Sequence, residues 1–248
     1  MAADDLLPPL DSPVADVLPV LRETPARSHT WRHLLTMTRG ARDDGPWEID
    51  AVSARPSGHV VHIANAPQLH PPGARFAYEN GGSHLVSAAA SEILGEPVSD
   101  YAARHLLAPI GVSDLEWPTD PEGYPTGAHG LRLSADALGA LGQLWLDHGQ
   151  VAGRPLMDPQ FFAEMTRPQS SGGPPEGVPY GFLTWTPAPI ILAGGWAGQH
   201  LLVVPAAAAV VVTTGDPGFE PGPPPTDQMP DDWRPALDLV RRRLLPVL

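Results

Sequence analysis

Residues 72–88 read Pro-Gly-Ala-Arg-Phe-Ala-Tyr-Glu-Asn-Gly-Gly-Ser-His-Leu-Val-Ser-Ala and contain the pattern that decides the fold. An extended segment leads to Tyr78 and Asn80, and apolar residues at helical spacing follow them. The spacing predicts a helix over residues 80–94 that ends at Gly95. Its apolar face is formed by Leu85, Val86, Ala89 and Ile93. The Tyr-x-Asn pair therefore stands at the start of a buried helix.

The same periodicity predicts further helices on both sides of this one. They cover residues 30–38, 99–107, 134–148 and 157–166. Thr30 and Ser134 are the expected N-caps, because a hydroxyl oxygen accepts a hydrogen bond from the unpaired N–H groups of a first helical turn. Gly40 and Gly149 are expected to end their helices.

The C-terminal part changes to short apolar runs rich in β-branched and aromatic residues, which are typical of strands. These runs cover residues 180–185, 199–204 and 209–214. Only four residues separate the last two runs, so they are expected to pair antiparallel. Residues 188–215 carry no charged side chain, but glycines and Pro205 interrupt them, which favours strands over a membrane helix.

These elements predict an α+β fold, in which an antiparallel sheet is flanked by helices and accompanied by a helical subdomain. We expect a single domain over residues 1–248. Its mostly helical part covers residues 11–170, and residues 178–248 contain the sheet strands and a closing helix at 233–245, after a proline-rich loop at 216–231.

Composition limits the classes of function. The chain has 248 residues with 42% hydrophobic content and a formal charge of −13, which argues against nucleic acid and anionic membrane partners. It has no cysteine, and all fifteen basic residues are arginines, so it contains no lysine. The first ten residues lack the basic and apolar sections of a signal peptide, so a cytoplasmic location is the default expectation. Composition does not indicate an oligomeric state.

The Tyr78–Asn80 pair allows two interpretations. A tyrosine at the start of a helix can accept or relay a proton if its pKa is depressed, while an asparagine amide two residues later orients a substrate carbonyl. Alternatively, Tyr78 packs in the core and Asn80 caps the helix, since asparagine is a favoured N-cap. Spacing alone favours the second interpretation.

A glycine-rich run, residues 193–199, also allows two interpretations. It reads Ala-Gly-Gly-Trp-Ala-Gly-Gln and leads into a predicted strand. Its glycines allow a ligand to approach the backbone, whose amides can then donate to an oxyanion. Taken alone, the run is more typical of a turn, with Trp196 covering the core.

The histidines show no metalloprotease pattern. His29 and His33 are four residues apart, and His59 and His62 are close in sequence, but neither pair has the accompanying glutamate. His84 follows Ser83 directly, and adjacent side chains on a helix diverge, so they do not form a dyad. We therefore expect no metal site and no cofactor.

Taken together, the two motifs resemble those of the serine beta-lactamase and penicillin-binding protein superfamily, in particular its class C beta-lactamase-like esterases and amide hydrolases. That family has a Ser-x-x-Lys motif, then Tyr-x-Asn, then Lys-Thr-Gly or His/Trp-x-Gly on an inner strand. Residues 32–40 are similar to the segment after the family's nucleophile helix, and residues 78–80 match its second motif. The third motif fits residues 193–195 or 196–198, and the sequence leaves both registers open.

The resemblance implies a small ester or amide substrate and a role for each motif. Tyr78 would assist proton transfer to and from the nucleophile, and Asn80 would bind the acyl carbonyl or the side-chain amide of the substrate. The backbone N–H of Trp196 or Gln199, according to register, would form half of an oxyanion hole beside Gly198. The family's lysine position falls on an uncharged residue in either register, which argues for esters or neutral amides over penicillins.

The family's first motif is absent from this sequence. None of the twelve serines is followed three residues later by a lysine, and no Gly-x-Ser-x-Gly elbow replaces the motif. We therefore expect the beta-lactamase-like domain to be incomplete at its N-terminus and the chain to be inactive alone. The alternative is a non-catalytic remnant that binds an ester, amide or peptidoglycan-like ligand.

Overall fold

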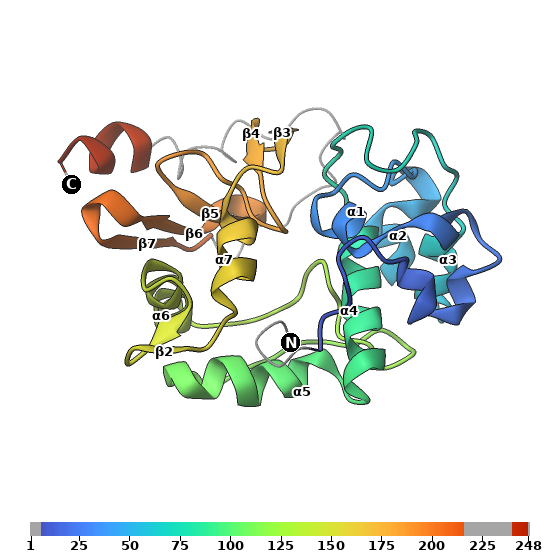
Figure 1. The fold of residues 1–248 in the computed structure, drawn as a ribbon, viewed down its shortest axis with the longest axis horizontal. Coiled ribbons are helices and arrows are strands. Elements are labelled where there is room, and N and C mark those ends of the chain that lie inside the picture. Colours follow the sequence, from blue (N-terminus) through green and yellow to red (C-terminus); the bar gives the residue numbers. More distant parts are fainter. Residues whose placement is uncertain (1–5, 216–239, 248) are drawn as a thin grey trace. The chain divides into compact units, whose positions relative to one another are not determined.

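The computed structural model describes residues 6–215 and 240–247, and its elements are drawn in Figure 1. The chain divides into two compact units, residues 1–132 and 133–248. Helices dominate the first unit, and the second contains small antiparallel sheets with helices. The predicted α+β fold is confirmed.

The described part of the first unit, residues 6–132, contains five short or medium α-helices. They are α1 (Trp31–Leu35), α2 (Ile49–Ser53), α3 (His59–Ala64), α4 (Gly81–Leu94) and α5 (Val98–Ala102), the last continuing through a π-helical turn at Ala103–Leu107. One-turn 3-10 helices occur at Val14–Asp16, Pro19–Leu21, Pro25–Ser28, Gly45–Trp47 and Ala108–Ile110. Their apolar side chains meet in one core, which includes Val14, Leu21, Trp31, Leu34, Ile63, Leu85, Ala88 and Ala89.

Helix α4 is the centre of this unit, and its limits agree with the prediction. It ends at Leu94, and Gly95 takes the left-handed conformation with φ of 67° that lets a chain leave a helix without a Cβ clash. The buried face is wider than predicted, because Ser83, His84, Ser87 and Ser91 are also buried. Three of these side chains are hydrogen-bonded: Ser87 Oγ donates to the Pro125 carbonyl, Ser91 Oγ donates to the Ser87 carbonyl, and His84 Nε2 bonds to Asp120 Oδ2.

Helix α1 begins as predicted but ends early. Thr30 caps it in a reciprocal box, since Thr30 Oγ1 accepts the His33 N–H and His33 Nδ1 accepts the Thr30 N–H. The helix stops at Leu35 because Met37 takes a positive φ of 53°, so the prediction that it extends to residue 38 and is ended by Gly40 was wrong.

The second unit begins with α6 (Ala135–Leu146), capped by Ser134 as predicted. It continues through a hairpin of β1 (Gln150–Val151) and β2 (Arg154–Pro155) to α7 (Pro159–Thr166). Two further strands, β3 (Ser170–Gly173) and β4 (Val178–Tyr180), pair antiparallel. The strands β5 (Ile191–Gly195), β6 (Gln199–Val204) and β7 (Ala209–Thr213) then form a meander (Figure 1).

The predicted pairing of residues 199–204 with the next strand is confirmed, with Leu202 opposite Val211. Helix α6 packs closely on β6 and β7, because a Cβ on Gly142 would lie only 2.4 Å from a methyl carbon of Val210. The end of the chain forms a π-helical turn at Val240–Leu244 and a 3-10 turn at Leu245–Val247. The predicted loop at residues 216–231 and the first part of the predicted closing helix lie outside the described residues.

The predicted strand at residues 180–185 was wrong. Only Tyr180 belongs to a strand there, since Leu183 has a positive φ of 47° and residues 181–184 turn back on themselves. A strand also occurs where we expected a turn, at β5. Its Gly194 and Gly195 lower the strand propensity, but β5 pairs along its whole length with β6.

Candidate active site

Tyr78 and Asn80 lie together in the first unit, where the backbone on each side of Tyr78 is fixed. The Ala77 N–H donates to the Met37 carbonyl at 3.0 Å, which ties the extended segment to the end of α1. The positive φ of Met37 is part of the turn that presents this carbonyl. Tyr78 is half-buried at the start of α4.

Glu79, between the two motif residues, is an anchor for this segment. Its side chain is 3% exposed and lies 3.0 Å, Oε2 to Nη2, from Arg39, which is 1% exposed. The same Oε2 accepts the Gly82 N–H at 2.7 Å, so Glu79 caps the first turn of α4. Arg39 also donates through Nη1 to the Ile63 carbonyl at 3.4 Å, which connects the pair to α3.

Two glycines make room for this buried ion pair. A Cβ on Gly82 would lie 2.1 Å from Glu79 Oε1, and a Cβ on Gly81 would lie 2.9 Å from Arg39 Nη2. Any other residue at position 82 would displace the carboxylate. The Gly81-Gly82 pair in the sequence is thus explained by the ion pair beneath the helix.

Asn80 is the N-cap residue of α4 by position only. Its side chain makes no capping hydrogen bond, and its backbone conformation, with φ of −93° and ψ of −28°, already approaches the helical region. Because Glu79 supplies the cap, the helix does not need the side-chain amide of Asn80 for capping. The capping role considered for Asn80 in the sequence therefore belongs to its neighbour.

A second carboxyl group, that of Asp43, interacts electrostatically with the Arg39–Glu79 ion pair. Burial is the main cause that raises the pKa of Asp43 to about 6, and the negative charge of Glu79 adds to the rise. The positive charge of Arg39 acts in the opposite direction. Asp43 is therefore a half-buried acid that titrates close to neutral pH.

In the second unit, the glycine-rich run is a strand followed by a tight turn. Residues 191–195 form β5, paired with β6 so that Gly195 lies opposite Gln199. Trp196–Gly198 is a one-turn 3-10 helix that joins the strands, with Gly198 at a positive φ of 78°. A Cβ on Gly195 would lie 2.9 Å from the Gln199 carbonyl oxygen, so the close approach of the strands there favours glycine.

Hydrogen bonds of Gln199 close the turn between β5 and β6. The Gln199 backbone N–H donates to the Trp196 carbonyl, and the Gln199 side-chain amide donates to the same oxygen at 2.9 Å. That N–H is therefore occupied within the turn. The strand itself carries residues 193–195, the first of the two registers.

Behind this strand lies a buried pair, Glu176 and His200. Glu176 Oε1 and His200 Nε2 are 3.7 Å apart, and their side chains are 2% and 0% exposed. A Cβ on Gly194 would lie 3.2 Å from Glu176 Oε1, so a glycine at this position allows the carboxylate to lie close to the backbone of β5. Sequence reasoning missed Glu176, His200 and Arg39, because single charged residues distant in sequence carry no spacing signal. Glu79 was overlooked within the motif itself.

The predicted site residues thus fall in two groups. Tyr78 and Asn80 adjoin in the first unit, and Trp196, Gly198 and Gln199 adjoin in the second. Among the serines, Ser53 Oγ lies 3.1 Å from His129 Nε2 at an exposed position, and His129 has no carboxylate hydrogen-bond partner within the described residues. This contact lacks the third group that orients the base of a catalytic triad.

Within the described residues, no helix is both long and apolar enough to cross a bilayer. A family described as Beta-lactamase matches residues 9–228. A search of curated proteins finds no match.

Several solved structures share the fold. EstCE1, a hydrolase with promiscuous acyltransferase activity, is 20% identical with a TM-score of 0.65, over 86% of this chain and 74% of that one. A penicillin-binding protein from Bacillus halodurans is 19% identical with a TM-score of 0.64, over 84% and 73% of the two chains. A D-stereospecific amidohydrolase from Streptomyces sp. is 17% identical with a TM-score of 0.57, over 81% and 68%.

The share of a matched structure that this chain spans is 74% for EstCE1 and 53% for SurE with D-Leu. At these identities the solved structures establish the fold alone. The family match covers residues 9–228, which is most of the sequence and includes both the Tyr78-Glu79-Asn80 segment and the β5 strand. The chain belongs to the beta-lactamase family, within the superfamily of serine beta-lactamases and penicillin-binding proteins.

Proposed function

We propose that this chain belongs to a hydrolase that cleaves ester or amide bonds through an acyl-enzyme, and that the nucleophile motif is missing from the chain. The observation that carries the proposal is the division of roles at residues 78–80. Glu79 caps α4 and pairs with Arg39, and this fixes the backbone next to Tyr78 and Asn80. The Asn80 side chain makes no capping hydrogen bond to α4. A site held by rigid elements is what preorganised catalysis requires.

In this proposal, Tyr78 assists proton transfer to and from the attacking hydroxyl, and Asn80 donates its amide to the acyl carbonyl. The Trp196 backbone N–H supplies half of the oxyanion hole. That choice of register is supported by the occupied N–H of Gln199 and by the position of residues 193–195 on β5. Gly198 and Gln199 then act by holding the turn that carries Trp196.

The substrate class follows from Ala193, which takes the family's lysine position in this register. An alanine cannot pair with the carboxylate of a penicillin as an ammonium would. We therefore favour a neutral ester or amide substrate.

A second candidate function is non-catalytic binding of an ester, amide or peptidoglycan-like ligand. The observation that favours it is the absence of lysine from all 248 residues, which excludes a Ser-x-x-Lys motif in this sequence. Both candidates use the same Asn80 amide, and they differ in whether a serine is ever acylated.

The test compares the chain with a longer protein in which a designed helix containing Ser-x-x-Lys precedes it. Hydrolysis of a p-nitrophenyl ester and of the beta-lactam nitrocefin is measured for both, after circular dichroism has confirmed folding. We expect the ester to be cleaved by the longer protein only, with nitrocefin cleaved much more slowly. Tyr78→Phe should lower the ester rate by roughly 10²–10⁴-fold, the usual contribution of general acid–base catalysis. A folded, inactive longer protein would favour the binding function.

A further inference from the structure

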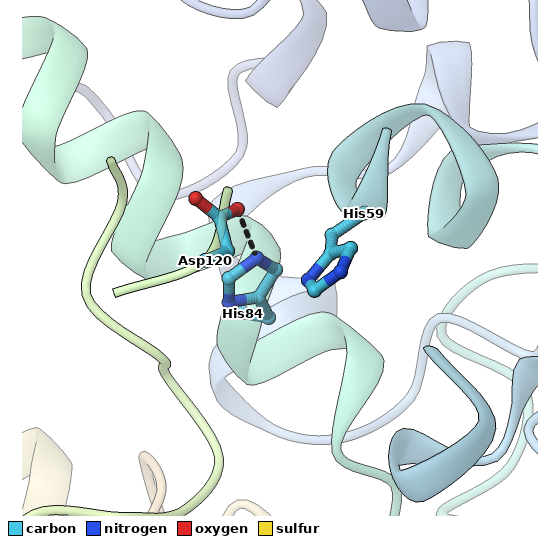
Figure 2. A group of neighbouring side chains, drawn as sticks. All are labelled: His59, His84 and Asp120. Atoms are coloured by element: carbon cyan, nitrogen blue, oxygen red, sulfur yellow. Dashed lines mark hydrogen bonds and ion pairs between the residues drawn. The ribbon is translucent and has the colours of Figure 1, made fainter. Parts of the chain in front are cut away.

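Three buried side chains that sequence reasoning did not connect lie together in the first unit. They are His59 at the start of α3, His84 on α4 and Asp120 in the segment after α5 (Figure 2). One possible metal-ligand atom from each lies within 4.8 Å of the others. His84 Nε2 and Asp120 Oδ2 are hydrogen-bonded at 3.0 Å.

Other contacts fix the orientation and tautomer of two of these groups. His59 Nε2 donates to the Arg55 carbonyl at 3.0 Å, so the lone pair of the neutral ring is on Nδ1. Asp120 Oδ1 accepts the N–H groups of Glu122 and Tyr124 at 3.0 and 2.9 Å, which directs Oδ2 towards His84. Such outer contacts orient the ligands of known metal sites.

We propose that His59 Nδ1, His84 Nε2 and Asp120 Oδ2 bind a Zn²⁺ ion. Two imidazoles and a carboxylate suit zinc, whereas Mg²⁺ prefers oxygen ligands. Zinc–ligand bonds of about 2.0–2.2 Å place tetrahedral ligand atoms roughly 3.3 Å apart. His84 and Asp120 are already close to that spacing, and a ring nitrogen of His59 lies within 4.8 Å of both, so a shift of about 1.5 Å is enough to close the set.

Zinc takes the place of the proton that His84 and Asp120 share. The proton of the neutral His84 ring moves from Nε2 to Nδ1, and no proton is released. His84 Nδ1 accepts the Gly127 N–H at 3.4 Å in the metal-free form, so two N–H groups face one another once zinc binds. The Gly127 amide then turns away from His84, and this movement should change the nuclear magnetic resonance signal of the Gly127 amide.

With three protein ligands the ion keeps its fourth position for water, and it joins separate parts of the first unit. Its ligands join α3, α4 and the segment of residues 119–127, which is already connected to α3 by bonds from the Gly58 and His59 N–H groups to Glu122. The expectation of no metal site came from short sequence spacings, and His84 and Asp120 are 36 residues apart. The neighbour of His59 in the sequence, His62, is used otherwise, since His62 Nε2 bonds to the Pro46 carbonyl.

The test uses the full chain, stripped with a chelator and titrated with Zn²⁺ by calorimetry. We expect one ion per chain, and at 100 times the dissociation constant a rise in melting temperature of about 5–10 °C. Mg²⁺ should give neither signal. Absence of zinc binding by the folded wild-type chain would refute the proposal.

Variants separate this site from zinc bound by other histidines. His59→Gln should weaken binding by more than the roughly 10–100-fold that loss of an outer-shell partner costs. Asp120→Asn should do the same, and His62→Gln, on the same helix, should bind as wild type. Unchanged binding by His59→Gln and Asp120→Asn would overturn the proposal.

If a variant does not fold, a measurement on the wild-type chain can test the proposal in its place. Nuclear magnetic resonance should show ring nitrogen shifts at His59 and His84 and a shifted Gly127 amide when one equivalent of Zn²⁺ is added. Stoichiometric zinc that leaves all three signals unmoved would place the ion elsewhere and refute the proposal.

Discussion

The Arg39 guanidinium lies 3.0 Å from the Glu79 carboxylate beneath the first turn of α4, and both side chains are almost completely buried. The same carboxylate oxygen accepts the Gly82 N–H. One ion pair thereby fixes the start of the helix and the backbone on both sides of Glu79. The positions of Tyr78 and Asn80 depend on this pair.

Glu79→Gln should destabilise the protein strongly, because it leaves the Arg39 charge buried without its counter-ion. We expect a loss of about 3–5 kcal/mol in the free energy of unfolding, measured by urea titration. The matched control is Glu116→Gln, which removes the partner of Arg132 from a pair whose side chains are 74% and 81% exposed. The control should match wild type within measurement error.

The double variant Arg39→Met, Glu79→Leu distinguishes a missing counter-ion from a packing defect. An apolar pair of similar volume avoids the uncompensated charge, so it should be more stable than Glu79→Gln alone. Equal stability of Glu79→Gln and wild type would show that the ion pair does not anchor the helix.

Asp43→Asn should stabilise the protein at neutral and alkaline pH. The pKa of Asp43 is raised from 3.8 to about 6, so the folded state disfavours the charged carboxylate. Its contribution to stability is present at low pH and is lost as pH rises through about 6, at a cost of roughly 1–3 kcal/mol. Unfolding titrations should show a gain for Asp43→Asn at about pH 8 that disappears near pH 4. A gain of the same size at both pH values would contradict the assigned pKa.

His29 should give a pH dependence of the opposite sign. Burial lowers the pKa of His29 from 6.5 to about 4, and its ring is bonded to Gln68 Oε1 at 2.9 Å. The stability it contributes is present above about pH 6.5 and falls by roughly 3 kcal/mol as pH falls towards 4. His29→Gln should remove this slope from the stability curve. His84, whose pKa burial also lowers, should retain its part of the slope. An unchanged curve for His29→Gln would count against the assignment.

Two glycines of α6 offer a matched comparison. Gly142→Ala places a Cβ 2.4 Å from Val210 and 2.7 Å from Leu201, so it should cost about 1–3 kcal/mol through overpacking. Gly139→Ala meets nothing within 4 Å and should stabilise the helix by up to about 1 kcal/mol. Thermal unfolding of both variants measures the difference. Equal effects of the two substitutions would argue against the close packing of α6 on the sheet.

The sequence predicts elements whose signals are local. Helix α4 with Gly95 and helix α6 with Ser134 were found because apolar spacing and end residues agree. Strand β5 was missed because its glycines serve a buried carboxylate and a close strand approach, which are tertiary requirements. The predicted strand at 180–185 failed because the chain turns at Leu183, whose positive φ is not a feature that strand propensity reports.

The residues of the candidate sites also fall into those that a local sequence signal predicts and those that only the fold brings together. Tyr78 and Asn80 were predicted from a three-residue motif, whereas Arg39 is 40 residues from Glu79 in the chain and carries no spacing signal. His59, His84 and Asp120 come from separate elements, and only folding brings their ring and carboxylate atoms within 4.8 Å. Partners of this kind are recognised from geometry.

The central claim is that this chain holds the acyl-binding residues of a serine hydrolase without its nucleophile. Intact-mass measurement after treatment with a fluorophosphonate probe tests it, on the chain alone and on the longer protein that carries a Ser-x-x-Lys helix before it. We predict no adduct on the chain alone and one adduct, on the added serine, in the longer protein. Stoichiometric labelling of a serine in the chain itself, Ser53 beside His129 included, or no labelling of the folded longer protein, would contradict the claim.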